Sequence, residues 1–405
     1  MRSFPEIATK RLAIKLRPKA ERLLKKGHPW VFSESIIKQN SEGETGDLAI
    51  IYDGKRNDIM GLGLYDAASP IRIKMIHTQG AAKIDHDFFK QKIKIAFEIR
   101  RPLLKTDTNS YRLLFGENDG FPGLIADVYK DVMVVKLYSG VWFPYLGDIL
   151  PILLATADCS TMVLRFSRNL QQKAIAMQLQ DGMVVAGELE DEVVEFKEHG
   201  INFSANVIKG HKTGYFLDHR HNRKRVGELA KGKTMLDVFS YAGGFSVHAL
   251  AGGATAVTSL DISAQALDMA KQNAALNAHA GEHHLMAIDA FEGLQKLIKA
   301  KKSFDIVVID PPSFAKSAAE VQKARHSYGR LAQLGAKLVA PNGILVLASC
   351  SSRVSADDFF DICDAELQNS GRRFKSLAKT YHDIDHPVTF PEGAYLKCGY
   401  YQLIG

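Results

Sequence analysis

The sequence predicts an α/β protein in which an open, doubly wound parallel sheet follows a small β-barrel and a small α+β region. Three observations predict this order. Residues 1–78 consist of short strand-like runs separated by Gly, Asp and Ser-Pro punctuation, which is typical of a small barrel or sandwich. Residues 79–207 begin with a helical pattern and continue as further strands, ending in a hairpin-like pair that turns at Gly200. In residues 208–405 strand-like runs alternate with helical patterns, which indicates parallel βαβ units.

Composition bounds the class of protein. The chain has 405 residues, of which 46% are hydrophobic and 24% charged, as in ordinary globular proteins. No run approaches the roughly 18 apolar residues that a membrane span needs, and the N-terminus lacks the apolar core of a secretory signal, so we expect a cytoplasmic protein. The four cysteines are widely scattered, which predicts reduced thiols and neither a disulfide framework nor a metal site.

The formal net charge of +7 favours a polyanionic partner such as nucleic acid. Lys and Arg concentrate in two runs, at residues 10–26 and 209–226. Taken alone, each run is better explained as a solvated face. The charge therefore supports nucleic-acid binding only together with other features of the sequence.

A glycine turn and three acids mark a candidate ligand site. Gly243 and Gly244 follow a strand-like run and allow a tight strand-to-helix turn, but the dinucleotide spacing G-x-G-x-x-G is absent. Asp237 lies within that strand, Asp261 ends the next one, where an acid suits a ribose diol, and Asp289 ends the following one, where a nucleobase edge would lie. This order resembles the S-adenosylmethionine pocket of class I methyltransferases. The alternative is a glycine pair that starts a helix, with acids that cap neighbouring helices.

The run "FDIVVIDPPSF" is the most specific motif in the chain. Apolar residues deliver Asp310 to the tip of a strand, and Pro311 and Pro312 stiffen the exit. This pattern is typical of methyltransferases that act on a nitrogen of bases or amides, although the aromatic residue, Phe314, comes one position later than usual. The alternative is an Asp-Pro-Pro turn after a buried strand.

Cys350 ends the next strand, "GILVLASC", so in a doubly wound sheet it is expected beside Asp310. A thiolate there can attack C6 of a pyrimidine and make C5 nucleophilic enough to take a methyl group. The adjacent acid can support protonation or hydrogen bonding at the N3/N4 edge of the base. The alternative is a buried structural cysteine, the commoner fate of a thiol next to an apolar run.

These motifs resemble, in order and over nearly the whole chain, the bacterial 23S ribosomal RNA 5-methylcytosine methyltransferases. The resemblance rests on "GHPWVFSESI" (27–36), "GENDGFPGLIADVY" (116–129), "KTGYFLDHRHNR" (212–223), "LDVFSYAGGFSVHAL" (236–250), "DPPSF", "SCS" and "DHPVTFPEGAYLK" (385–397). It implies a PUA-type RNA-binding domain over residues 1–78, a middle α+β domain over 79–207 and a Rossmann-like catalytic domain over 208–405. It also implies that the partner is 23S ribosomal RNA, as the large subunit or its precursor.

The resemblance implies roles for particular residues. Cys350 would be the covalent nucleophile and Asp310 its partner at the base edge. The S-adenosyl-L-methionine pocket would consist of Asp237, Gly243, Gly244, Asp261 and Asp289, with Asp218 and Arg220 closing it. The chain departs from the family at His219, where glutamine is frequent, and at Ala242, where threonine is. Neither change removes a group that the mechanism needs.

Two other functions fit the residues. Guanine N7 methylation needs no cysteine and would leave Cys350 structural, whereas a protein that binds S-adenosylmethionine and RNA without chemistry would need neither Cys350 nor Asp310. The presence of both residues favours cytosine C5 methylation.

We also expect Glu392 and Lys397 to pair beside the final strand. The sequence leaves open the target nucleotide, the base that removes the C5 proton and the oligomeric state, for which a homodimer through the outer domains is one arrangement.

Overall fold

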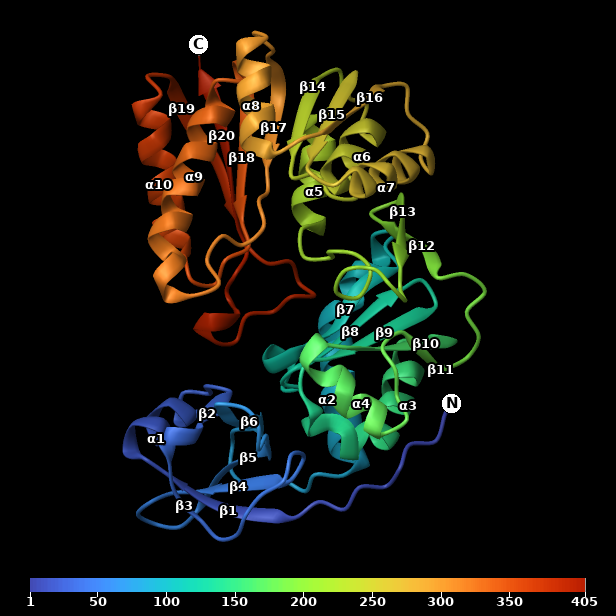
Figure 1. Cartoon of the computed structure of the whole chain (residues 1–405), viewed down its shortest axis with the longest axis vertical. Helices are drawn as coiled ribbons and strands as arrows, with labels where there is room; N and C mark the ends of the chain where they lie inside the picture. The colour runs from blue at the N-terminus through green and yellow to red at the C-terminus, as the bar shows by residue number, and fades with distance from the viewer. Residues whose placement is uncertain (405) are drawn as a thin grey trace. The chain divides into compact units, whose positions relative to one another are not determined.

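Four sheets organise residues 1–404, the part of the chain that the structure, a computed structural model, describes (Figure 1). By its internal contacts the chain divides into two units. The first unit comprises residues 1–200, 204–217 and 384–393, and the second comprises 201–203, 218–383 and the segment from Ala394 onward. In the described part of the chain, no helix is both long and apolar enough to span a membrane.

The first unit begins with the small β-barrel region that the sequence predicts. Its sheet has the order β2-β6-β5-β4-β1-β3, in which β1 pairs parallel with β4 and the other pairs are antiparallel. Burial alternates along β1, so Leu12, Ile14 and Leu16 face a core. The elements are β1 (Arg11–Leu16), α1 (Pro18–Lys25), β2 (Trp30–Phe32), β3 (Ile36–Gln39), β4 (Leu48–Tyr52), β5 (Ile59–Tyr65) and β6 (Ile71–His77).

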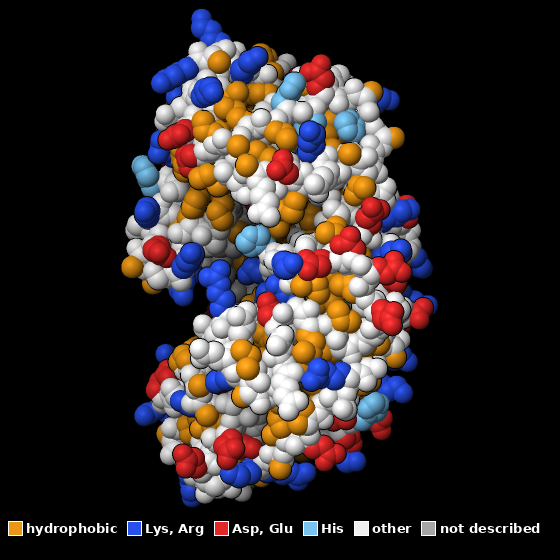
Figure 2. Space-filling view, turned by 45° about the vertical axis from the view of Figure 1, so that its right-hand side comes forward, with side chains coloured by type: hydrophobic (Ala, Val, Ile, Leu, Met, Phe, Trp, Pro, Cys, Tyr) orange, Lys and Arg blue, Asp and Glu red, His pale blue; other side chains and the backbone are white. Residues whose placement is uncertain are grey.

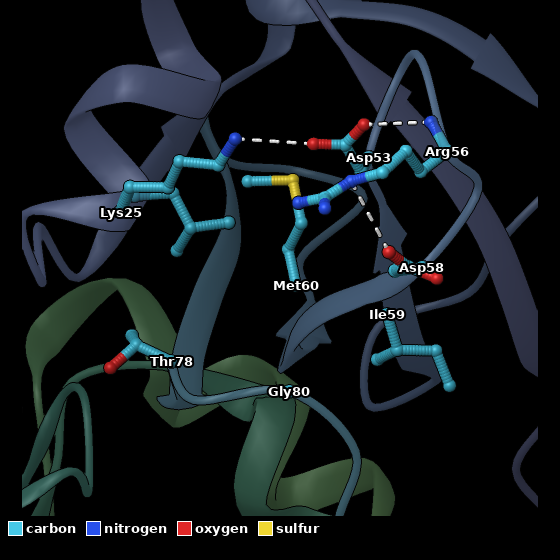
Figure 3. Close-up of a pocket in the computed structure, with 9 residues that line it drawn as sticks. Lys25, Asp53, Arg56, Asp58, Ile59, Met60, Thr78 and Gly80 are labelled. Carbon is cyan, nitrogen blue, oxygen red and sulfur yellow. Dashed lines mark hydrogen bonds and ion pairs between the residues drawn. The ribbon is translucent and has the colours of Figure 1, made fainter.

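A cavity of about 200 Å³ lies in this region, beside the end of α1 and the loop after β4 (Figure 3). Lys25 Nζ lies 3.1 Å from Asp53 Oδ2, and Asp53 Oδ1 accepts the backbone N–H groups of Lys55 and Arg56. The backbone N–H groups of Arg56 and Lys55, followed by the Lys25 ammonium, hold the pKa of Asp53 well below its usual range. Because Lys25 and Arg56 face Asp53 and Asp58, the lining offers no net charge to attract an anion.

The α+β region of the first unit is built on a sheet of order β11-β10-β9-β8-β7. Its first helix begins at Asp85, whose side chain accepts the backbone N–H of Phe88 at 3.1 Å. The elements are α2 (His86–Arg100), β7 (Ser110–Phe115), β8 (Leu124–Tyr129), β9 (Val132–Leu137), α3 (Leu146–Thr156), β10 (Thr161–Phe166), α4 (Gln171–Ala176), β11 (Met183–Ala186), and the hairpin strands β12 (Val193–Glu198) and β13 (Ile201–Asn206).

The barrel and the α+β region share one core. Leu62, Leu64 and Ile76 of the barrel belong to the same buried cluster as Phe89 and Ile93 of α2. This shared core explains why the internal contacts group the two regions as one unit, although the sequence analysis draws a boundary at residue 78.

The second unit contains a seven-stranded sheet of order β16-β15-β14-β17-β18-β20-β19 (Figure 1). The first five strands in this order are parallel, and β20 runs antiparallel to both β18 and β19. The elements are α5 (Arg220–Leu229), β14 (Thr234–Val238), α6 (Gly244–Ala251), β15 (Ala256–Asp261), α7 (Ala264–Ala275), β16 (Glu282–Ala287), α8 (Ala290–Lys299), β17 (Phe304–Ile309), α9 (Val321–Ala336), β18 (Val339–Ser349), α10 (Ala356–Asn369), β19 (Arg373–Thr380) and β20 (Lys397–Ile404). The doubly wound α/β sheet predicted from the sequence is confirmed.

The connection between β19 and β20 was not foreseen as part of the first unit. Residues 384–393 of this connection belong to that unit. Arg100 Nη2 donates to the carbonyl of Asp385, and Asp385 Oδ2 accepts the backbone N–H of Arg112. His386 Nδ1 lies 2.9 Å from Asp385 Oδ1, and both side chains are fully buried. These polar contacts anchor the segment, because unpairing buried charged groups is costly.

Candidate active site

The strand order of the second unit reverses between β14 and β17, which lie side by side. In doubly wound sheets, ligands bind at the carboxyl edge at this point. Asp237 lies near the end of β14, Asp310 follows β17, and Cys350 follows β18, which pairs with β17. The structure therefore brings these three sequence-predicted residues to one edge of the sheet.

The turn from β14 into α6 has an unusual backbone. Phe239, Tyr241 and Gly243 all have positive φ, at 65°, 47° and 77°. Asp261 at the end of β15 holds the turn, because its Oδ2 accepts the backbone N–H of Tyr241 at 2.9 Å. Non-glycine residues in this conformation store strain, which proteins concentrate at ligand sites.

Gly243 is needed for both conformation and space. A Cβ on Gly243 would lie 2.7 Å from the Cβ of Ala270 on α7. We expect Gly243→Ala to lower the free energy of unfolding by about 2–4 kcal/mol, since it combines a positive φ with a close contact. Gly371→Ala is the matched control, because Gly371 has φ +73° and nothing within 4 Å of its Cβ position. It should cost only about 1 kcal/mol in denaturant unfolding; equal costs would show that the approach to Ala270 is not tight.

Asp237 is buried, and only one of its two carboxylate oxygens accepts hydrogen bonds among the described residues. Its Oδ2 accepts the backbone N–H of Ser246 at 3.1 Å and the hydroxyl of Ser246 at 2.6 Å. A row of hydrogen bonds continues from Ser246. Ser259 Oγ lies 2.6 Å from Ser246 Oγ and 2.8 Å from His283 Nε2. Among the described residues, Asp237 Oδ1 has no hydrogen-bond partner. Burial, together with the charges of Asp310 and Asp261, raises the pKa of Asp237 to about 7. A cationic ligand beside Oδ1 would favour the ionised carboxylate.

Asp261, the residue that the sequence predicts to meet a ribose, is followed by an exposed apolar side chain. Its Oδ1 accepts the backbone N–H of Ser263 at 2.9 Å. Ile262 is 74% exposed, an unusual position for a large apolar side chain next to a candidate ligand residue. A flat apolar ligand group placed there would cover it.

Asp289 shows the helix-capping role that the sequence left open as the alternative. It lies two residues beyond the end of β16, and its Oδ1 accepts the backbone N–H groups of Phe291 and Glu292 at the start of α8. A ligand at Asp289 would therefore meet a carboxylate with one oxygen already engaged.

Cys350 and Asp310 lie close together. Cys350 Sγ lies 3.6 Å from the carbonyl oxygen of Pro311, the residue after Asp310. Burial, and then the carboxylates of Asp310 and Asp218, raise the pKa of the Cys350 thiol to about 12. The thiol is therefore stored in its protonated form when no substrate is bound.

Lys397 supports the segment that carries Cys350. Its ammonium group is buried and donates to the carbonyl of Val354 at 2.5 Å, to that of Tyr395 at 3.2 Å and to that of Ser351. Burial lowers the pKa of Lys397 to about 8. The expected pair of Lys397 with Glu392 is wrong, because Lys397 is fully used by carbonyls. Glu392 instead lies 3.5 Å from His28 Nε2 within the first unit.

Asp218 lies two residues before α5, and Arg220 is the first residue of that helix. Asp218 Oδ2 accepts the hydroxyl of Tyr395 at 2.8 Å and is near enough to Cys350 to raise its pKa. Arg220 is fully buried, and its Nη1 lies 3.1 Å from Asp383 Oδ2. Asp218 thus lies next to the thiol, while Arg220 is held in an ion pair.

Sequence reasoning did not place three groups at this edge, although it named two of them, His219 and Lys397, in other roles. Lys397 could have been assigned to this edge as the one charged residue in the run "LKCGYYQLI" (396–404). His219 lies next to the motif residues Asp218 and Arg220, and its Nε2 lies 3.4 Å from Asp310 Oδ1. Tyr395 gave no signal, since nothing local indicates that its hydroxyl reaches Asp218.

These groups fit a cofactor that carries positive charge and a ribose but no phosphate. The unpartnered Oδ1 of Asp237 suits a cation or a donor, Asp261 suits a ribose diol, and the phosphate-binding glycine spacing is absent. Ser240 Oγ, in the β14–α6 turn, is also buried without a hydrogen-bond partner among the described residues. S-adenosylmethionine has this combination of groups. The fold and the site together define a class I S-adenosylmethionine-dependent methyltransferase.

Comparison with known proteins gives the same class. A family model described as an S-adenosylmethionine-dependent methyltransferase matches residues 155–393, and one described as a PUA-like domain matches residues 14–78. A ribosomal RNA large subunit methyltransferase from Deinococcus radiodurans is 42% identical over 99% of this chain and 100% of its own length. A ribosomal RNA large subunit methyltransferase I from Aeromonas salmonicida is 34% identical over 93% of this chain and 96% of its own. The chain belongs to the same family as these methyltransferases.

Solved structures share the fold. A protein from Streptococcus mutans described as a SAM-dependent methyltransferase superposes with a TM-score of 0.81 at 21% identity, over 96% of this chain and 99% of its own. A methyltransferase crystallised with S-adenosylhomocysteine gives a TM-score of 0.80 at 21% identity, over 97% and 100% of the two chains. The predicted cofactor, S-adenosylmethionine, and the predicted fold class are confirmed.

Proposed function

We propose that this methyltransferase modifies C5 of a cytosine in 23S ribosomal RNA through a covalent adduct with Cys350. The observation that carries the proposal is the position of the Cys350 thiol beside Asp310, at the ends of the adjacent strands β18 and β17. A nitrogen nucleophile such as guanine N7 needs no thiol, whereas C5 of cytosine does.

Each of the two residues has a distinct task. The Cys350 thiolate adds to C6 of a flipped-out cytosine, and the electron density that this addition places on C5 makes that carbon nucleophilic. Asp310 meets the N3/N4 edge of the base and supports protonation or hydrogen bonding there as the addition places negative charge on N3. The bound cofactor supplies the methyl group as an electrophile. Afterwards C5 loses its proton to a base, and the C6–Sγ bond breaks to restore the cysteine.

Burial of the thiol shapes this step. Because the thiolate is disfavoured at rest, Cys350 is protected from adventitious alkylation and oxidation until the base arrives. Addition to C6 consumes the thiolate as it forms, so a large free population is not required. The Lys397 ammonium group lowers the pKa of the thiol, in opposition to the two carboxylates.

The cofactor residues are proposed on the same basis. Asp237 would face the cationic end of the cofactor and Asp261 its ribose, with Gly243 and Gly244 forming the turn beside it. Asp289 would lie at the nucleobase. Asp218 and Arg220 would bound the site from the start of α5. Ile262 is added to this set, since its exposed side chain can pack against the nucleobase.

The charge of Asp237 should make cofactor binding depend on pH. Its pKa of about 7 means that the carboxyl is mostly protonated at pH 6, and a cationic cofactor favours the ionised form, so binding releases a proton. We expect the affinity for S-adenosylmethionine to rise about tenfold from pH 6 to pH 8 in calorimetric titrations. Asp237→Asn should bind more weakly at both values. The variant should show no rise with pH, and a rise equal to that of wild type would contradict the proposal.

Ribosomal RNA as the substrate is supported by the relatives, which are named ribosomal RNA large subunit methyltransferases, and by the PUA-like domain match. The face in Figure 2 shows Lys and Arg side chains interspersed with Asp and Glu rather than gathered into one patch. The net charge of +7 would act through phosphate contacts, so RNA affinity should fall as salt rises.

The homodimer stays a prediction that sedimentation analysis would check.

The test is to incubate the protein with radiolabelled S-adenosylmethionine and 23S ribosomal RNA from cells that lack this modification, and then to identify the methylated nucleoside. We expect 5-methylcytosine. Isolated RNA, the large subunit and a precursor particle should be compared as substrates. Methylguanine as the product would overturn the proposed chemistry while leaving the enzyme class intact.

A further inference from the structure

His219 lies between the start of α5 and Asp310 and is almost completely buried, at 5% exposure. Its ring packs edge-on against Phe245 of α6, with centroids 5.5 Å apart. Its Nε2 points toward Asp310 Oδ1 at 3.4 Å. Among the described residues, Nε2 has no formed hydrogen bond. A buried nitrogen aimed at a single carboxylate, at slightly more than hydrogen-bond distance, is a contact that can tighten when the substrate binds.

The other side of the ring is held by Asn222, whose amide orientation can be assigned from its neighbours. Asn222 Oδ1 lies 2.6 Å from Thr380 Oγ1 and 3.0 Å from the Tyr400 hydroxyl. A separation of 2.6 Å is ordinary for O–H···O and shorter than usual for N–H···O. The amide oxygen therefore faces the two hydroxyls, and the amide nitrogen faces His219 Nδ1 at 3.2 Å.

This orientation fixes the tautomer of His219. Because Asn222 Nδ2 donates, His219 Nδ1 must accept, and the ring proton then lies on Nε2. Burial lowers the pKa of His219, while Asp310 and Asp218 together raise it above its ordinary value and Arg223 opposes them. A second proton, however, would have to sit on Nδ1 against the amide hydrogens of Asn222. If the Asn222 amide turned to accept that proton, its oxygen would lose the hydrogen bonds that the Thr380 and Tyr400 hydroxyls donate to it.

We propose that His219 is a positioning residue that donates its Nε2–H to Asp310 Oδ1 and leaves Oδ2 to meet the substrate base. The proposal rests on the proposed function, in which Asp310 meets the N3/N4 edge of cytosine. If Asp310 delivers a proton to N3, that proton must lie on Oδ2, since Oδ1 is occupied as an acceptor. His219 cannot act as the general base in this arrangement, because its one accepting nitrogen is covered by Asn222.

The first test requires no RNA. The protein is labelled with ¹⁵N-histidine, and the His219 ring signals are assigned as those lost in His219→Gln. We expect one protonated nitrogen, Nε2, and one unprotonated nitrogen, Nδ1, at pH 8. In Asn222→Asp a carboxylate faces Nδ1, so both nitrogens should become protonated. A wild-type ring that is protonated on Nδ1 at pH 8, alone or with Nε2, would overturn the proposal.

The second test measures single-turnover methyl transfer. A glutamine side chain offers an N–H group to Asp310 and an oxygen to Asn222, so His219→Gln should keep kcat within about threefold. His219→Leu fills the space without a donor and should lose about 10- to 100-fold in kcat, with cofactor affinity unchanged. His326→Gln, at an exposed position on α9, controls for the substitution itself. Equal kcat in the leucine and glutamine variants would overturn the positioning role.

The two tests separate this proposal from the proposed function. If wild type makes no 5-methylcytosine but the ring carries its proton on Nε2, the cytosine chemistry fails and the assignment of the His219–Asp310 contact stands. If wild type makes 5-methylcytosine and the leucine variant is fully active, the chemistry stands and His219 is only structural.

Discussion

Replacing Cys350 with alanine is expected to reduce methyl transfer by about 10⁴-fold or more, while cofactor affinity stays within about twofold. The reason is chemical: without addition of the thiolate to C6, C5 of cytosine is too weak a nucleophile to take the methyl group. Single-turnover transfer from radiolabelled S-adenosylmethionine to ribosomal RNA measures the rate, and calorimetry measures the affinity. Cys363→Ala is the matched control, since Cys363 is another buried thiol of the second unit, on α10. It should cost some stability but leave the rate unchanged.

The same thiol predicts the pH dependence of the wild-type rate. The pKa of Cys350 is raised to about 12, so the reactive thiolate is a small fraction at neutral pH. That fraction increases tenfold with each pH unit as long as the pH stays below the pKa. We expect single-turnover kcat/KM to increase with pH from 6 to 9, until a step other than addition limits the rate.

The first of two outcomes would contradict the cytosine mechanism, and the second would contradict the predicted pH dependence. A Cys350→Ala variant that methylates RNA at the wild-type rate would make Cys350 structural, as guanine N7 chemistry requires. A wild-type rate that is independent of pH would show that the thiolate does not form in the step that limits single turnover.

Asp310→Asn is expected to lower methyl transfer by about 10²- to 10³-fold and, at the same time, to make Cys350 more reactive toward iodoacetamide. Methyl transfer slows while alkylation accelerates, and each effect has its own physical reason. The amide cannot act as an acid at the base edge, but its neutrality removes a carboxylate that raises the pKa of the thiol. Alkylation of Cys350 should therefore accelerate several-fold at pH 7.5, as followed by peptide mass spectrometry.

Asp305→Asn provides the control for this prediction. Asp305 lies on the same strand, β17, but its Oδ2 accepts the backbone N–H and the hydroxyl of Thr234, at 2.8 and 2.9 Å. The Asp305 variant should leave the alkylation of Cys350 unchanged. If Asp310→Asn slows alkylation instead, then Asp310 does not oppose the thiolate, and the arrangement proposed for this pair is wrong.

Local patterns of the sequence sufficed for the order of the elements and for the chemistry at the strand ends. The alternation of apolar runs and helical patterns predicts the sheet of the second unit, and the same runs place Asp310 and Cys350 at adjacent strand ends. Such predictions succeed because strand ends are marked locally, by glycine, proline or an acid after an apolar run. The sequence also has a helix-like pattern from Trp142 to Ala157, but the α-helix of the structure covers only part of it. Residues 140–145 form a 3₁₀-helix before α3 begins, and Pro144, which lies within that segment, cannot donate a helical hydrogen bond.

The sequence by itself thus determined the fold class, the cofactor and the two residues at the centre of the proposed chemistry. Only the tertiary structure decided how those two residues are held. The carbonyls around Cys350 are gathered by Lys397 from the start of β20, and Asp310 is faced by a His219 whose tautomer depends on Thr380 and Tyr400. No local signal joins these segments, because they are distant in the chain and meet only when the strands pair across the sheet. Burial in the packed edge of the sheet then moves the pKa values of the Cys350 thiol, Lys397 and Asp237 far from their ordinary values, which no local sequence pattern can do.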